Sequence, residues 1–366
     1  MTALATWVLW AAFGLSAAFG AIAQRTQFCT MGAVSDIVTM GDWRRMRMWV
    51  MAIGVAMIGF NLMVAVGWLD AANSIYGGPR FIWLSALVGG AMFGFGMVLA
   101  SGCGSKTLVR IGGGNLKSLV VFLVLGISAF ATIKGITAVV RVSTVDSIAI
   151  TFDTGQDLPS LLSASTGVAR TTLAAVLGVG IGSVLIVWSL AKADGRSADN
   201  LLAGIGIGAI IAGVWWVSGR LGHVAEDPNT LQEAFVATNS RRMESLSFVA
   251  PVAFTLDWLM FFSDKGKLLT IGIVSVAGVV VGSAAYSLLT RRFRWEGFRD
   301  AGDTANHLVG ALLMGVGGVT ALGCTVGQGL SGMSTLSLTS FVAVVAIIAG
   351  AVAALQYQIW RIERAG

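Results

Sequence analysis

The fold is decided by the stretch Ala100-Ser-Gly-Cys103-Gly-Ser-Lys106-Thr-Leu-Val-Arg110-Ile-Gly-Gly-Gly-Asn-Leu-Lys117. It lies between two apolar runs, each long enough to cross a bilayer. Polar, glycine-rich backbone cannot face lipid at that position, because every unpaired N–H or C=O group is costly in hydrocarbon. We therefore expect this stretch to fold into the protein and line a cavity, with Cys103 at its apex.

A second copy of the pattern occurs near the other end of the chain. Gly94-Phe-Gly-Met-Val-Leu-Ala-Ser-Gly-Cys103 aligns without gaps with Gly315-Val-Gly-Gly-Val-Thr-Ala-Leu-Gly-Cys324. The two copies predict a single membrane domain built of two pseudo-symmetric halves, about 1–165 and 170–366. The third cysteine, Cys29, follows the first apolar run in a context that resembles the repeat only loosely.

The composition indicates the class of protein. Of the 366 residues, 56% are hydrophobic and 11% are charged, and the mean hydropathy is +0.82. A soluble domain carries about a quarter charged residues, so we predict an all-α polytopic membrane protein in contact with lipid. The net charge of +6 fits cytoplasmic arginines and shows no nucleic-acid patch. Neither histidine has partners at metal-ligand spacing, and no cofactor motif is present, so we expect no metal and no cofactor.

Apolar windows of about 20 residues predict nine spans. They cover residues 4–23, 48–69, 81–99, 116–140, 169–190, 200–218, 268–289, 304–322 and 337–360. Four pieces between them are too short or too polar to span, and we expect them to form re-entrant or interfacial segments. These are Phe28–Met40, Gly104–Gly114, Leu246–Phe262 and Thr325–Ser334.

The charges that flank the spans predict their orientation. Arginine and lysine gather in the connections 24–47, 191–199 and 290–303, whereas acidic residues gather in 141–168 and 219–246. By the positive-inside rule, the N-terminus is outside (periplasmic) and the C-terminus cytoplasmic. The two Cys-containing copies then enter the membrane from opposite faces, which is the inverted-repeat design of many transporters.

The three cysteines have two interpretations. Cysteine in a membrane helix is often only a small apolar residue. Here, however, Cys29, Cys103 and Cys324 each follow a glycine-rich span at the start of an irregular segment, which favours a path for a sulfur-containing anion. The residues that could support its passage with backbone N–H groups, neutral donors or positive charge are Gly102, Gly104, Ser105, Lys106, Arg110, Gly323, Thr325 and Gln328.

Lys106 and Arg110 lie three and seven positions after Cys103, so all three share one face of a helix. The two cations either anchor the segment at the cytoplasmic surface or form a cationic exit vestibule for an anion, and the sequence leaves both possibilities open.

The contexts of the three cysteines together resemble the YeeE/YedE family of sulfur transporters. The resemblance rests on Thr26-Gln-Phe-Cys29-Thr-Met-Gly-Ala-Val-Ser-Asp36, Ser101–Lys117 and Gly323-Cys324-Thr-Val-Gly-Gln-Gly-Leu-Ser331, and it extends over nearly the whole chain. It implies thiosulfate uptake across the bacterial inner membrane and an hourglass shape with short helices dipping in from both sides. It also implies a path of three thiols with Cys103 at the centre, and a TusA-like cytoplasmic sulfur carrier as a partner.

Three functions follow as hypotheses. The first is a transporter of thiosulfate or of a related sulfur or selenium oxyanion, which meets Cys324, Cys103 and Cys29 in turn. The second is a membrane sulfurtransferase or thiol oxidoreductase that forms a cysteine persulfide, since Lys106 and Arg110 could activate Cys103. The third is a purely structural membrane partner of a transport complex.

Overall fold

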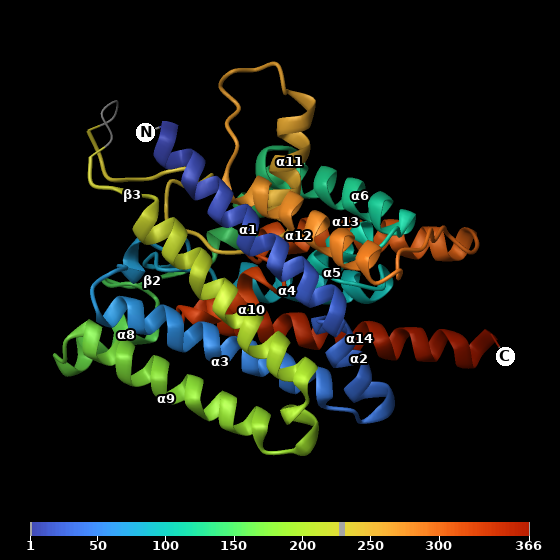
Figure 1. Ribbon diagram of the computed structural model, residues 1–366, viewed down its shortest axis with the longest axis horizontal. Helices are drawn as coiled ribbons and strands as arrows, with labels where there is room; N and C mark the ends of the chain where they lie inside the picture. The colour runs from blue at the N-terminus through green and yellow to red at the C-terminus, as the bar shows by residue number, and fades with distance from the viewer. Residues whose placement is uncertain (1, 227–230, 366) are drawn as a thin grey trace.

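The computed structural model describes residues 2–226 and 231–365, and long helices dominate it (Figure 1). These long helices are α1 (Thr2–Thr26), α3 (Arg44–Ala65), α4 (Trp83–Leu99), α6 (Leu116–Lys134), α9 (Arg170–Leu190), α10 (Ala198–Trp216), α12 (Ile271–Leu289), α13 (Ala301–Thr320) and α14 (Leu338–Ala365).

Short helices occupy all four segments that the sequence predicts to be too short to span. They are α2 (Thr30–Met40), α5 (Gly104–Gly112), α11 (Ala250–Met260) and the π-helical turn η5 (Gly327–Gly332). The remaining short helical elements are η1 (Ala71–Asn73), α7 (Ile136–Ser143), η2 (Val145–Ser147), α8 (Leu158–Thr166), η3 (Ala193–Arg196) and η4 (Val217–Leu221). Two antiparallel pairs form the described sheet structure: β1 (Arg80–Phe81) with β2 (Ile150–Thr151), and β3 (His223–Val224) with β4 (Ala234–Phe235).

The predicted class, an all-α polytopic membrane protein, is confirmed. Within the described ranges, eight helical segments are long and apolar enough to cross a bilayer. The prediction of nine includes α13, whose first turns carry Asp303, Asn306 and His307 and are therefore less apolar. The predicted boundaries differ from the observed ones by a few residues, and the largest difference is in the span 116–140. Its helix ends at Lys134, because the backbone turns at Gly135 and α7 starts a new direction.

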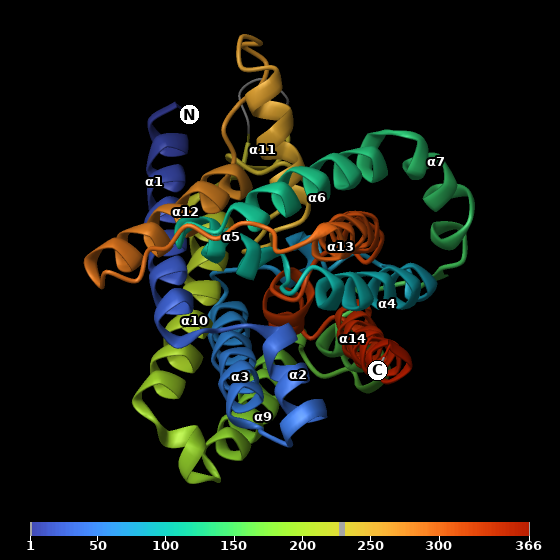
Figure 2. The same cartoon turned by 90° about the vertical axis from the view of Figure 1, so that its right-hand side faces the viewer.

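The helices pack in a crossed pattern that joins the two ends of the chain (Figure 2). α1 packs along α12, and α3 packs along α10. α4 lies between α13 and α14, and α13 also packs against α6. Glycine permits very close contacts between helices: a Cβ atom on Gly282 of α12 would lie 1.9 Å from the carbonyl oxygen of Ala17 on α1. Such small-residue contacts hold membrane helices together where no hydrophobic effect does so.

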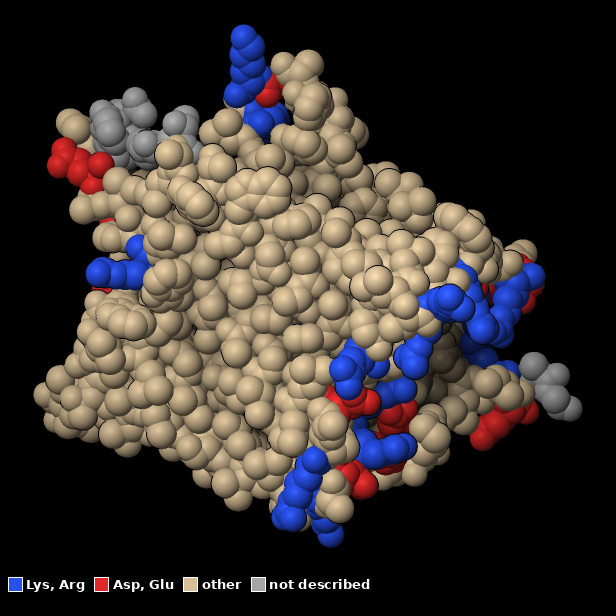
Figure 3. All heavy atoms as spheres, viewed as in Figure 1, with Lys and Arg blue, Asp and Glu red and all other residues tan. Residues whose placement is uncertain are grey.

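Charged side chains lie mainly at the ends of these helices. Figure 3 shows a wide uncharged band across the molecule, with lysine and arginine gathered near the end that holds the C-terminus. Arg44, Arg291 and Arg292 are exposed at these helix ends. This arrangement matches a protein whose middle faces lipid.

We expect Gly282→Ala to destabilise the protein by about 1–3 kcal/mol, the usual cost of overpacking. The added methyl group would overlap backbone of α1, so the two helices must separate. Thermal unfolding in detergent measures the effect. Gly14→Ala is the control, since a Cβ atom there meets nothing within 4 Å; equal melting temperatures for the two variants would contradict this packing account.

Candidate functional site

The same turn breaks three helices immediately before the three cysteines. Gln27, Ser101 and Leu322 each adopt the left-handed conformation, with φ of 54°, 56° and 57°. In each case the next residue donates its N–H group five positions back: Phe28 to Ala23 O (3.2 Å), Gly102 to Met97 O (2.8 Å) and Gly323 to Gly318 O (2.8 Å). This is the Schellman motif, which ends a helix while satisfying its last carbonyl groups.

Each cysteine then begins a new helical segment. The Cys29 carbonyl accepts from Ala33 N (3.0 Å), that of Cys103 from Thr107 N (2.9 Å), and that of Cys324 from Gln328 N (2.7 Å). The sulfurs of Cys29 and Cys324 also accept a backbone N–H from the residue three positions on, each at 3.4 Å. The thiols therefore lie at helix N-termini, where the helix dipole favours negative charge.

The three segments converge. The thiols of Cys29 and Cys103 lie close enough to interact, and Cys103 also faces Thr325, the residue after Cys324. Ser105 Oγ lies 3.3 Å from Cys103 Sγ. All three cysteines are buried and unoxidised. Chain segments that are far apart in sequence thus form one buried cluster of sulfhydryl and hydroxyl groups.

Lys106 places a positive charge beside this cluster. Its side chain is buried, interacts with the thiols of Cys29 and Cys103, and donates from Nζ to Gln27 Oε1 at 2.6 Å. Among the described residues it forms no ion pair with a carboxylate, whereas the other buried lysine, Lys117, pairs with two. A buried cation without a counter-charge is costly, so a bound anion would stabilise this arrangement.

The other predicted contact residues lie around the helix breaks before Cys103 and Cys324. Gly102 lies against the side chains of Lys106 and Arg110, and Arg110 Nη1 donates to Ser101 O at 2.7 Å. Gly104 packs against the Phe248 carbonyl, and Gly323 lies in the turn before Cys324. Gln328 is tied up by the protein itself, because it donates to Ala321 O (2.5 Å) and accepts from Ser340 Oγ (2.6 Å). One amide N–H and the carbonyl oxygen of Gln328 therefore hold the break in place.

Sequence reasoning missed three residues at this centre. Gln27 binds Lys106, and no motif marks it. Tyr76 donates its hydroxyl to Gly327 O at 2.7 Å across a long sequence separation. Phe248 stands before α11 and directs backbone toward the Cys324 thiol. Phe248 could have been found from the sequence. It lies at the start of the predicted short segment Leu246–Phe262, and a cysteine lies at the start of each of the other three short segments.

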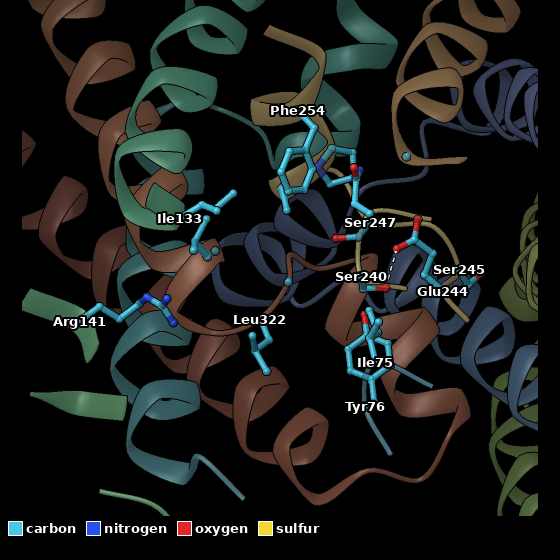
Figure 4. Close-up of a pocket in the computed structure, with 17 residues that line it drawn as sticks. Ile75, Tyr76, Ile133, Arg141, Ser240, Glu244, Ser245, Ser247, Phe254 and Leu322 are labelled. Atoms are coloured by element: carbon cyan, nitrogen blue, oxygen red, sulfur yellow. Dashed lines mark hydrogen bonds between the residues drawn. The ribbon is translucent and has the colours of Figure 1, made fainter. Parts of the chain in front are cut away.

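Two cavities adjoin the cluster from different directions. One of about 330 Å³ reaches Leu322 and Gly323, just before Cys324, and Figure 4 shows Tyr76, Glu244 and Arg141 around it. We call it the Glu244 cavity. The other, of about 250 Å³, is polar and reaches Ser101, just before Cys103. Its titratable lining residues are Arg110, Lys117, Glu296, Arg299, Asp303 and His307. We call it the Arg110 cavity.

Within the ranges 2–226 and 231–365, no group of three or more His, Cys, Asp or Glu side chains could hold a metal ion. The site is instead made of thiols, hydroxyls, backbone N–H groups and a lysine. Such groups can hold an anion through hydrogen bonds of moderate strength.

Comparison with known proteins identifies the family. Residues 25–353 match the family described as sulphur transport. The chain is similar to the thiosulfate transporter TsuA of Escherichia coli, with 28% identity over 86% of this chain and 84% of that protein. It is also similar to TsuA of Spirochaeta thermophila (24% identity, 89% and 92% covered). A shorter match, 32% identical over 25% of this chain and 21% of the relative, is to a probable transporter YedE of Salmonella typhimurium.

The matches confirm the resemblance to the YeeE/YedE family and set aside the hypothesis of a sulfurtransferase or thiol oxidoreductase. The chain belongs to the sulphur transport family and is a membrane transporter, not an enzyme.

Proposed function

We propose that the protein takes up thiosulfate across the bacterial inner membrane along a path formed by Cys324, Cys103 and Cys29. The observation that carries the proposal is the convergence of three buried thiols beside Lys106, a buried cation with no carboxylate partner among the described residues. Two relatives that cover most of the chain are named thiosulfate transporters.

The chemistry of the cluster suits thiosulfate. Its terminal sulfur is soft and polarisable, like the thiols, while its oxygens accept hydrogen bonds. Thr325 Oγ1 is buried beside Cys103 and has no partner of normal hydrogen-bond geometry. Such a buried hydroxyl is costly unless it is satisfied, and an oxygen of the passing anion would satisfy it. Thiols are weak donors, so they hold the anion loosely enough for it to move on.

The two cavities support a route for the anion. We place the Glu244 cavity on the outer side, so that the anion meets Cys324 first, then Cys103 and Cys29. It leaves toward the cytoplasm past Lys106 and Arg110, where the Arg110 cavity opens. In this scheme the halves 1–165 and 170–366 are inverted copies. The crossed packing of α1 with α12 and of α3 with α10 supports it, because the two pairs exchange places under such symmetry.

A small cytoplasmic sulfur carrier of the TusA type is the partner we propose at the inner end. The exposed arginines at the C-terminal end of the molecule, seen in Figure 3, would face it and attract an acidic surface.

We expect Cys103→Ala to abolish uptake of radiolabelled thiosulfate in proteoliposomes, and growth on thiosulfate as sole sulfur source. The substitution removes the thiol that interacts with Cys29, Ser105 and Thr325. Cys29→Ala and Cys324→Ala should reduce uptake less. Wild-type uptake by Cys103→Ala would eliminate the thiol path.

Lys106→Met tests whether the buried positive charge of Lys106 is needed for uptake. We expect uptake to fall by at least tenfold, since a hydrogen bond to a charged group is worth about 1.5–3 kcal/mol. The melting temperature should stay level or rise, because the variant no longer buries an unpaired charge. Lys117→Met is the matched control: it leaves Glu296 and Asp303 without their lysine, so it should lower the melting temperature. A Lys106→Met protein with wild-type uptake would contradict a role in anion transfer.

Labelling tests the orientation. Asp153→Cys should react with a membrane-impermeant maleimide in intact cells, whereas Arg292→Cys should react only after the membrane is opened, because arginine-rich connections stay in the cytoplasm. Both positions are exposed, and the native cysteines are buried. The unsubstituted protein therefore provides the background, and the reverse labelling pattern would invert the proposed route.

A further inference from the structure

The Glu244 cavity contains one carboxylate, an unexpected group at the mouth of an anion path. Glu244 belongs to the connection between η4 and α11 and is half-buried in the wall of the cavity (Figure 4). Its Oε2 accepts a hydrogen bond from Ser240 Oγ at 3.2 Å. Ionised, it would repel an anion in this mostly apolar space; protonated, it could donate a hydrogen bond to one.

The other groups that face Glu244 do not neutralise it. Arg141 of α7 lies on the opposite side of the cavity in Figure 4 and pairs with Asp146 at 2.5 Å. Tyr76 interacts with Glu244 on one side and with Cys324 on the other. The cavity-lining residues of α6, α11, α12 and α13 are uncharged: Ile133, Ala250, Pro251, Phe254, Gly272, Gly318 and Val319. No lysine or arginine pairs with Glu244 among the described residues.

Glu244 also lies on the way to the first thiol. The cavity that it lines is bounded by Leu322 and Gly323, whose turn presents Cys324. Tyr76, which lines the same cavity, donates its hydroxyl group to the carbonyl oxygen of Gly327, three residues after Cys324. An anion that approaches Cys324 through this cavity therefore travels along a wall that includes the Glu244 carboxyl group.

We infer that Glu244 is a protonation-dependent entry residue, which admits the substrate anion when its carboxyl group is neutral and repels it when ionised. This inference rests on the proposed function of anion uptake through Cys324. Burial raises the pKa of Glu244 to about 7, against an ordinary value of 4.5, while the hydrogen bonds from Ser240 and the Asn239 backbone oppose the rise. The carboxyl group therefore holds its proton below about pH 7 and loses it above.

The test measures the initial rate of labelled thiosulfate uptake by the full-length protein in proteoliposomes, with equal pH on both sides, from pH 6 to 8. The wild-type rate should fall about tenfold, because the neutral fraction of a group with pKa near 7 changes by about that factor. Glu244→Gln, which cannot ionise, should keep its pH 6 rate at pH 8. A flat wild-type profile, or a Glu244→Gln profile that still falls, would overturn the inference.

Two further variants keep the test decisive if Glu244→Gln folds poorly. Ser240→Ala removes a hydrogen bond that favours the ionised carboxylate, so the midpoint of the pH profile should move upward; an unmoved midpoint counts against the inference. Glu233→Gln is the matched control in the same connection, since Glu233 pairs with His223 and does not line this cavity. It should keep the wild-type profile, and a flattened one would show that Glu244 is not the group responsible.

The test of Glu244 and the test of the thiol path can fail independently of each other. Uptake that survives in Cys103→Ala would remove the thiol path without affecting the pH profile of Glu244→Gln. A falling profile in Glu244→Gln would remove the entry residue and leave the thiol path intact.

Discussion

Backbone hydrogen bonding inside a low-dielectric layer is the constraint on which the whole structure depends. A helix can be broken there only if the groups released by the break find new partners. The protein meets this condition three times with the same device, a left-handed residue that closes one helix and a cysteine that opens the next. The left-handed residues Gln27, Ser101 and Leu322 are not glycine, so each break costs about 1–2 kcal/mol. The surrounding helices must supply that free energy.

The breaks explain why the functional groups meet. A continuous helix would place each cysteine on a separate surface, facing lipid or a neighbour. Ending the helix turns the chain back into the protein and aims the next N-terminus, with its thiol, at the centre. Lys106 reaches the same centre because it lies one turn into α5, where its stem is covered and its ammonium group contacts Gln27. The positions of sulfur, hydroxyl and positive charge therefore all derive from the same backbone geometry.

The sequence reveals the helices and the short segments because both depend on local composition. Apolar length marks the spans, and the polar run around Cys103 cannot be placed against lipid. The tertiary partners of the site are harder to foresee. Gln27, Ser101 and Leu322 look like ordinary helix residues, since nothing in them favours positive φ as glycine would. Tyr76 and Gly327 are joined by packing alone. Gln328 carries the right chemistry for a ligand, but its role is set by Ala321 and Ser340, which no local pattern connects to it.

The close contact of α1 with α12 bears on how the chain is made. Gly20 of α1 and Gly282 of α12 let the two helices approach so closely that a Cβ atom at either position would overlap the backbone of the other helix. Yet α1 emerges from the ribosome well before α12, because it lies far earlier in the chain. Until then α1 has no α12 to pack against, and the surface around Gly20 lacks its final neighbour. The packing of α1 against α12 is therefore completed only late in the synthesis of the chain.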